Sequence, residues 1–150
     1  MYKHIAIAID GGEISARAVA SGAQLAKSLG AKVSLIWVAE PYAPQVLAVT
    51  PYPFVPVLSS QEFEQQVGAI AARVFADATA VARANGAAEV HCERATAMQT
   101  YKGILEAAAR IGADLLVMAS HGRRGISALV LGSETQKVLT HSTLPVLVVR

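Results

Sequence analysis

A glycine-bearing segment in the last third of the chain has the residue types and spacing of an anion-binding loop. It reads Ala119-Ser120-His121-Gly122-Arg123-Arg124-Gly125, and Gly132-Ser133-Glu134-Thr135 follows after a short apolar stretch. The segment begins where a predicted buried strand, 115–118, ends, and it stops at an expected helix start with Ser133 as the N-cap. Glycines let the backbone approach a ligand closely, and the N–H groups of a helix start favour negative charge. This arrangement predicts a phosphate site, and therefore a nucleotide.

Asp10 is a second candidate, because it directly follows the predicted first strand, 4–9. Open α/β sheets bind ligands outside the carboxyl ends of their strands. A carboxylate there could accept hydrogen bonds from a ribose or an adenine amine, or hold a metal ion. The alternative is an Asx turn that caps the first helix, and both interpretations stay open at this point.

Several other chemistries do not fit the sequence. No Walker loop is present, and Asp10-Gly11-Gly12-Glu13 is not the dinucleotide fingerprint, so its glycines are better explained by a tight turn into a helix. Ser120 and His121 suggest a hydrolase, but a nucleophile elbow needs G-x-S-x-G, and Met118 stands at its first glycine. The four histidines lack the spacing of zinc ligands.

Alternating strand-like and helix-like segments must position these residues. Strands are expected over 4–9, 33–38, 89–94, 115–118 and 145–149. Helices are expected over 15–29, 61–85, 101–110 and 133–141, and the first three end at or near a glycine. Five strands joined through helices imply right-handed crossovers and a parallel sheet covered on both faces.

The composition predicts a single domain over 1–150. The chain is 53% hydrophobic and 16% charged, which suits a sheet buried on both faces. The net charge of +2 is small and the basic residues are scattered, so nucleic-acid binding is not expected. No apolar run approaches the roughly 20 residues of a membrane span, and the N-terminus lacks a signal-peptide pattern. The single cysteine, Cys92, is expected to be buried, and a cytoplasmic protein is expected.

Residues 41–60 interrupt the alternation. Positions 41–56 hold five of the six prolines, together with Tyr42, Tyr52 and Phe54. Proline removes backbone donors, so this segment is predicted to be a loop inserted into the domain. Long loops in compact domains are often functional, so a lid over a site and a packed surface excursion are both retained.

Together these features resemble the universal stress protein family. The resemblance rests on the glycine segment, the helix after it, the final Leu144-Pro145-Val146-Leu147-Val148-Val149, the first strand into Asp10-Gly11 and the second strand ending at Val38. It covers the whole chain apart from the proline-rich segment. It implies a doubly wound five-stranded parallel α/β sheet of order 3-2-1-4-5, in which Asp10 and Ala119 face each other across the crevice at the topological switch.

The nucleotide-binding branch of this family carries the motif G-x2-G-x9-G-[ST]. The matching positions are Ala119, Gly122, Gly132 and Ser133, so only the first glycine is replaced. Alanine adds a methyl group and disfavours positive φ, but at a strand end with negative φ its N–H can still donate. The resemblance also implies that the pocket is lined by Ala8, Ile9, Asp10, Val38, Met118, Glu134 and Thr135.

The function implied by the resemblance is an ATP-binding regulatory or stress-response module with at most slow hydrolysis. Adenine would lie between Ile9 and Val38 at the sheet edge, and Asp10 would hold the base or ribose. The glycine segment would hold the phosphates, with Mg²⁺ bridging them. Two alternatives remain. One is a dimeric interaction module that binds no nucleotide, which the alanine at 119 favours, and the other is a hydrolase or transferase that uses the Ser-His pair.

The last predicted strand, 145–149, is apolar on both faces, and no helix follows it in the sequence to cover its edge. An exposed edge of this kind invites pairing with another chain. A two-fold axis would let the strand pair with its own antiparallel copy, and the resemblance implies the same arrangement. We therefore expect a homodimer through this strand, with neither nucleic acid nor membrane as a partner.

Overall fold

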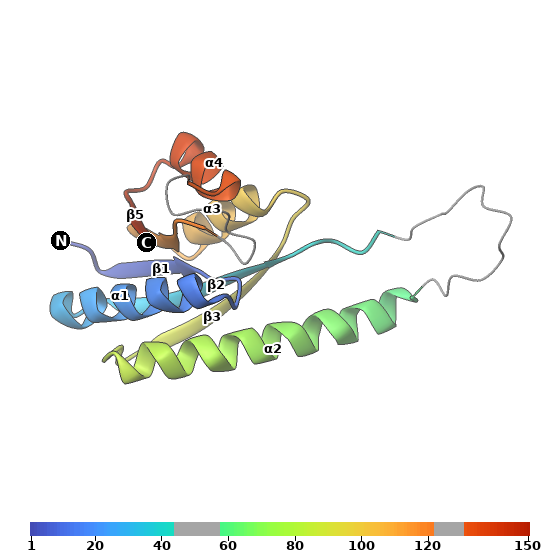
Figure 1. Ribbon diagram of the computed structural model, residues 1–150, viewed down its shortest axis with the longest axis horizontal. Coiled ribbons are helices and arrows are strands. Elements are labelled where there is room, and N and C mark those ends of the chain that lie inside the picture. Colours follow the sequence, from blue (N-terminus) through green and yellow to red (C-terminus); the bar gives the residue numbers. More distant parts are fainter. Residues whose placement is uncertain (44–57, 122–130) are drawn as a thin grey trace, which may run out of the picture.

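The computed structural model describes residues 1–43, 58–121 and 131–150, in which five parallel strands form one sheet of order β3-β2-β1-β4-β5 (Figure 1). The strands are β1 His4–Ala8, β2 Lys32–Ala39, β3 Val90–Thr96, β4 Leu115–Ala119 and β5 Val146–Val149. The helices are α1 Glu13–Leu29, α2 Ser60–Ala84, α3 Thr100–Arg110 and α4 Ser133–His141. The predicted fold class and strand order are confirmed, and each bound lies within two residues of its predicted place.

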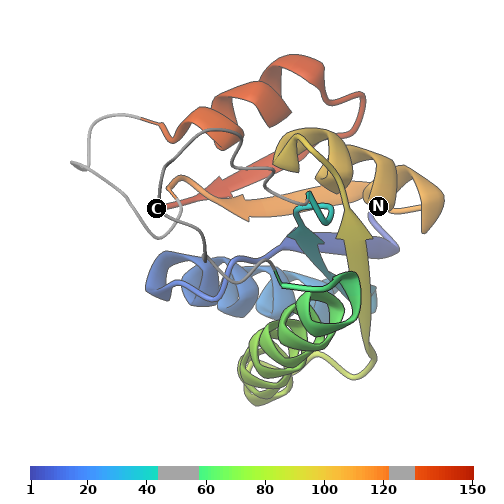
Figure 2. The same ribbon diagram turned by 90° about the vertical axis from the view of Figure 1, so that its right-hand side faces the viewer.

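Two helical layers cover the two faces of the sheet, with α1 and α2 on one face and α3 and α4 on the other (Figure 2). All five residues of β1 are buried, as expected for a central strand. Because side chains alternate along a strand, Ile5 and Ile7 enter the core under α1 and α2, whereas Ala6 and Ala8 enter the core under α3 and α4.

The register brings the carboxyl ends of the central strands together at one edge. Ile7 of β1 lies beside Val117 of β4, and Ala8 lies beside Ile36 of β2. The chain leaving β1 turns into α1 on one face, whereas the chain leaving β4 leads to α4 on the opposite face. This divergence creates the topological switch point at which open α/β sheets bind ligands.

Polar contacts fix the opposite end of β1. The Asp114 carboxylate accepts hydrogen bonds from the Lys3 and His4 amides at 2.8 and 3.0 Å. Burial opposes the charge of this carboxylate, but the amide hydrogen bonds outweigh burial and hold its pKa below the ordinary value. Burial, helped by the charge of Lys32, lowers the pKa of His4, whose Nε2 lies 2.8 Å from the Ser34 hydroxyl.

The proline-rich segment falls largely on residues 44–57, so the choice between a lid and a surface excursion lies outside the described residues. Its two flanks contact each other. The Tyr42 hydroxyl donates to the carbonyl oxygen of Leu58 at 2.7 Å, and the Tyr42 ring packs 5.3 Å from the Phe63 ring. A capping box between Ser59 and Glu62 then starts α2.

One burial prediction is wrong: Cys92 is exposed on β3. β3 lies at the edge of the sheet, and the Cys92 sulfur lies 3.7 Å from the Thr79 hydroxyl of α2. Side chains on an edge strand are less buried than those on a central strand. The residue type of cysteine predicts burial but does not indicate the position of its strand in the sheet. None of the helices in the described ranges has both the length and the apolar character needed to cross a membrane.

Candidate functional site

Asp10 lies in the turn that joins β1 to α1. The Ile9 amide extends the sheet by donating to the Ile36 carbonyl at 2.9 Å. One carboxylate oxygen of Asp10 then accepts from the Gly12 amide at 2.8 Å, which is an Asx turn. Gly11 within this turn has a φ of 78°, which only glycine adopts readily. The Asx turn is confirmed, but it does not cap the helix, because the N-cap of α1 is Gly12 and no side chain caps it. Contact between Asp10 and a ligand remains a prediction.

The end of β4 is tied to the start of α4 across the gap in the described chain. Ser120 continues the sheet by donating its amide to the Val149 carbonyl at 2.7 Å. The Ser120 carbonyl accepts the Gly132 amide at 2.8 Å and the Thr135 hydroxyl at 3.2 Å. These bonds fix the direction in which the N-terminus of α4 points.

The N-terminus of α4 is capped differently from the prediction. Gly132, not Ser133, is the N-cap, because its backbone is extended and its carbonyl accepts the Gln136 amide at 3.0 Å. No side chain caps this helix. The amides of residues 133–135 precede the first intrahelical bond and have no acceptor inside the helix. In the described residues, no acceptor is recorded for these three amides, whereas the Gly132 amide is bonded to Ser120, and the anion site itself stays a prediction.

Gly132 sits where a larger residue would crowd the backbone. A Cβ atom built there would lie 3.1 Å from the Ser120 carbonyl oxygen and 3.4 Å from the His121 Cα atom. Its φ of −59° is ordinary, so close approach and not backbone conformation is the reason for glycine. The neighbouring motif residue, Gly122, lies outside the described residues.

The apolar residues predicted to line the pocket come from both faces of the sheet. Ala8, Val38 and Met118 belong to the core under α3 and α4. Ile9 and Ala119 belong to the core under α1 and α2. All five lie in or just beyond the carboxyl ends of the central strands. Adenine held between Ile9 and Val38 would therefore lie over the edge of the sheet and not against one face.

Glu134 and Thr135, also predicted to line the pocket, use their side chains in protein contacts. Thr135 is 3% exposed, and its hydroxyl donates to the Ala119 carbonyl at 3.0 Å as well as to Ser120. The Glu134 carboxylate accepts the Tyr101 amide of α3 at 2.8 Å. Sequence reasoning missed Tyr101, since no spacing pattern connects two residues that are 33 positions apart.

The Ser-His pair of the hydrolase alternative is present but poorly placed for catalysis. The Ser120 hydroxyl lies 3.0 Å from His121 Nδ1, yet Ser120 is only 2% exposed. His121 Nε2 is buried and has no hydrogen-bond partner, so in the described residues no carboxylate orients the ring as a triad requires. The same ranges contain no group of three His, Cys, Asp or Glu side chains that could hold a metal ion.

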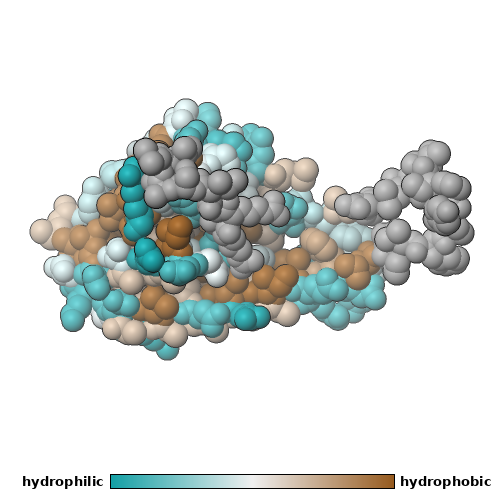
Figure 3. Space-filling view, in the orientation of Figure 1, coloured by the Kyte–Doolittle hydropathy of each residue, from teal (hydrophilic) through white to brown (hydrophobic). Residues whose placement is uncertain are grey.

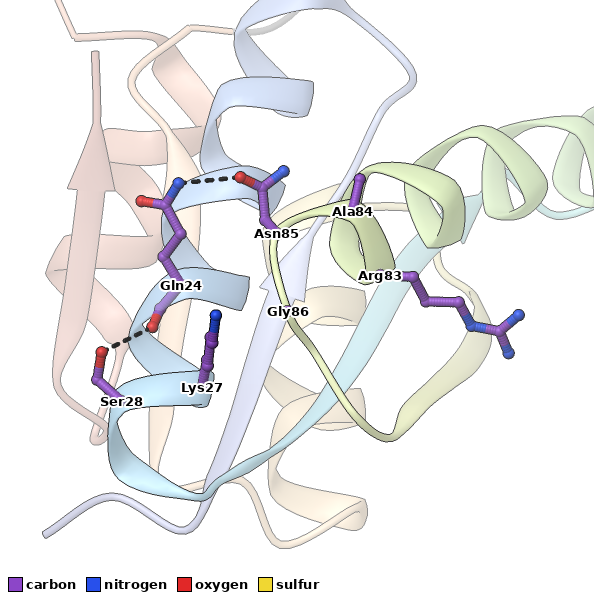
Figure 4. A pocket seen from close by; sticks show the side chains of 7 residues that line it. All are labelled: Gln24, Lys27, Ser28, Arg83, Ala84, Asn85 and Gly86. Carbon is purple, nitrogen blue, oxygen red and sulfur yellow. Dashed lines mark hydrogen bonds between the residues drawn. The ribbon is translucent and has the colours of Figure 1, made fainter.

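A separate pocket of about 640 Å³ lies between the C-terminal parts of α1 and α2 (Figure 4). Gln24 donates to Asn85 at 2.9 Å across it, and the Arg83 head group points away from both. Because these helices run antiparallel to the strands, the pocket lies at the amino edge of the sheet, opposite the crevice. It contains none of the predicted site residues.

A parallel sheet of order β3-β2-β1-β4-β5, with β1 and β4 at the topological switch and the start of α4 bonded to the end of β4, defines an open, doubly wound α/β protein. The family model described as "Universal stress protein family" matches residues 1–150, and the chain belongs to this family.

Similar proteins cover the whole chain. Universal stress protein YxiE of Bacillus subtilis (strain 168) is 30% identical over 152 aligned residues and covers both chains completely. A Thermus aquaticus relative, "Universal stress protein in QAH/OAS sulfhydrylase 3'region", is 33% identical with the same coverage. Among solved structures, a universal stress protein in complex with cAMP is 26% identical, has a TM-score of 0.72, and is matched over 99% of this chain and 97% of that one.

Proposed function

We propose that this protein binds an adenine nucleotide, with ATP as the expected ligand, in the crevice between the ends of β1 and β4. The observation that carries the proposal is the start of α4, which has no side-chain cap and presents three backbone amides without an acceptor in the helix. The complex of a 26% identical family member with cAMP supports an adenine nucleotide as the ligand class.

The residues present suit such a ligand. Gly132 lies close to Ser120 and has no side chain, so the backbone would be accessible to phosphates at this place. Asp10 would accept hydrogen bonds from the base or ribose, and Ile9 and Val38 would contact the base. Mg²⁺, if it binds, would arrive with the nucleotide and would offset part of the phosphate charge.

We infer a regulatory role in the cytoplasm, with at most slow hydrolysis. The Ser120 hydroxyl is buried, and in the described residues His121 Nε2 has no hydrogen-bond partner, so the pair does not form an activated nucleophile. The hydrolase alternative has no support from this geometry.

The alternative in which no nucleotide binds depends on Ala119. Its side chain packs against the core under α1 and α2, which directs the methyl group toward protein. Ala119 also continues the ladder with β5, opposite Val149. Both observations favour the nucleotide-binding interpretation over a pocket closed by this methyl group.

We also propose a homodimer that forms through β5. In the described part of the chain, β5 pairs only with β4, so its other edge offers free backbone groups. Leu147 in this strand is 39% exposed and Leu139 in α4 is 43% exposed. A two-fold axis beside β5 would pair the strand with its antiparallel copy and cover Leu147.

Calorimetric titration of the intact protein with ATP and Mg²⁺ tests the nucleotide proposal. We expect saturable binding of ATP at one site per chain, and a parallel titration with GTP measures the preference for the base. The absorbance at about 260 nm of the filtrate from denatured protein reports any nucleotide that was carried through purification. An absence of binding at millimolar ATP, in protein shown to be nucleotide-free, would overturn the proposal.

A further inference from the structure

Helix α3 lacks an N-terminal cap of its own. Its N-cap residue, Gln99, makes no side-chain cap bond, and its first turn contains no acidic residue. The Tyr101 amide, at the second position of the helix, is a group that an N-cap side chain normally satisfies. Here the acceptor comes from another helix, because Glu134 of α4 takes this amide at 2.8 Å.

The Glu134 carboxylate is held at both oxygens. The oxygen that does not accept from Tyr101 lies 2.7 Å from the Lys137 ammonium nitrogen. Lys137 in turn lies 5.7 Å from the centre of the Tyr101 ring, whose other neighbour is the stacked ring of His141 at 5.2 Å. This cluster joins the first turn of α3 to the whole length of α4.

The same turn of α3 packs tightly against the end of β2, where Val38 is proposed to contact the base. We call this end of β2 the base side of the site. A Cβ atom at Gly103 would lie 2.8 Å from Val38 Cγ1 and 2.9 Å from the Ala97 Cβ atom. There is no space between this turn and the end of β2, so a shift of α3 toward β2 must move Val38. The first turn of α3 therefore contacts Val38 on one side and Glu134 on the other.

We propose that Glu134 is a positioning residue that does not contact the nucleotide. Through α3, it holds the start of α4, where the phosphates would bind, at a fixed position relative to Val38, where the base would bind. The role in binding rests on the function proposed above. The link between the two helices rests on the contacts alone.

Charge explains why an acidic residue is acceptable at this place. A carboxylate in the first turn of α4 that faced the phosphates would repel them. The Glu134 carboxylate is instead turned toward the N-terminus of α3, where the helix dipole favours it, and it is paired with Lys137. The free amides of α4 therefore keep their attraction for an anion.

Two variants separate positioning from ligand contact. Glu134→Ala removes the acceptor of the Tyr101 amide, whereas Glu134→Gln keeps an oxygen that can accept it and removes the charge. A matched control is Glu62→Ala, which deletes the carboxylate of the capping box at the start of α2, remote from the crevice (Figure 1). Amide hydrogen exchange at Tyr101 and calorimetric ATP affinity are measured for each intact variant.

For Glu134→Ala we expect exchange at Tyr101 to accelerate about tenfold and the dissociation constant for ATP to rise about fivefold, which correspond to the loss of one capping bond. Glu134→Gln should restore both quantities to within about twofold of the unmodified protein. Glu62→Ala should leave both unchanged.

Three results would overturn the proposal. One is unchanged exchange at Tyr101 in Glu134→Ala. Another is a loss of ATP affinity in both Glu134 variants without faster exchange, which would make the residue a ligand. The third is markedly tighter ATP binding by Glu134→Gln, which would show uncompensated repulsion. If the unmodified protein bound no nucleotide, the proposed function would fall, and the exchange data alone would still decide whether Glu134 holds α3.

Discussion

Thr135 donates its hydroxyl proton to the carbonyl oxygen of Ala119, 3.0 Å away, so the first turn of α4 is bonded to the last residue of β4. The same hydroxyl lies 3.2 Å from the Ser120 carbonyl oxygen. A side chain that is 3% exposed thus serves two carbonyl groups at the point where the sheet ends. This contact fixes the first turn of α4 against the end of the sheet.

Thr135→Val should destabilise the protein while keeping the shape of the side chain. It removes a buried donor and leaves carbonyl oxygens with fewer partners, so the free energy of unfolding should fall by about 1–2 kcal/mol. Thr140→Val is the matched control, because Thr140 bonds the Gln136 carbonyl on the exposed side of the same helix. Urea denaturation measures both, and equal effects would contradict the assigned role of Thr135.

Ser133→Glu should weaken ATP binding by about 10- to 100-fold, or roughly 1–3 kcal/mol, because it adds negative charge at the first position of α4. Gly132→Val should have a similar effect through the close approach to Ser120. Ser60→Glu places the same charge at the first position of α2 and is the control. Equal ATP titrations for Ser133→Glu and Ser60→Glu would show that the phosphates lie elsewhere.

Ala119→Gly should change ATP affinity only modestly, because residue 119 is in regular strand pairing with Val149 and needs no glycine conformation. The measurement is the same titration. A gain above about 30-fold, roughly 2 kcal/mol, would show that the methyl group obstructs the site. The module without a nucleotide would then describe the natural protein better.

Leu147→Lys should shift the proposed dimer toward monomer, since it places like charges on both sides of a two-fold axis. The neighbouring Val146 and Val148 pack against the core under α3 and α4, so lysine at those positions would also damage the fold. Light scattering at micromolar concentration measures the assembly. A monomeric unmodified protein under those conditions would refute the dimer.

His4 should make the protein less stable below neutral pH. Its pKa is lowered in the folded state, so the native protein prefers the neutral ring. Its stabilising contribution is complete above the ordinary pKa of 6.5 and is lost as the pH falls below that value. His4→Gln keeps a hydrogen bond to Ser34 without titrating. Its Tm should therefore fall less between pH 7.5 and 5 than that of the unmodified protein, by about 2 °C.

The fold could be predicted because local patterns and chain order were sufficient for it. The strands are short apolar runs, three helices end at or near glycines, and parallel pairing through helices leaves few topologies. The position of Asp10 beyond β1 and of Ala119 at the end of β4 follows from that topology.

The finer features of the site could not be predicted, because they depend on contacts between distant residues. Ser133 is a good N-cap by residue type, yet the Gly132 carbonyl accepts the first intrahelical bond, so the cap moves by one position. The contact between Glu134 and Tyr101 needs α3 and α4 side by side, which is a property of tertiary packing. The exposure of Cys92 likewise follows from the place of β3 at the sheet edge.

Helix α2 is longer than the sheet that it covers. Its first buried residue is Val67, so the turns before it extend past the core (Figure 1). Phe63 is the one apolar residue among positions 60–66, and hydrophilic residues cover the outer side of this end of α2 (Figure 3). Its stability therefore depends on the Ser59–Glu62 capping box and on Tyr42 and not on core packing. We therefore expect the turns before Val67 to form a separate, weaker cooperative unit, which opens and recloses while the sheet and both cores stay intact.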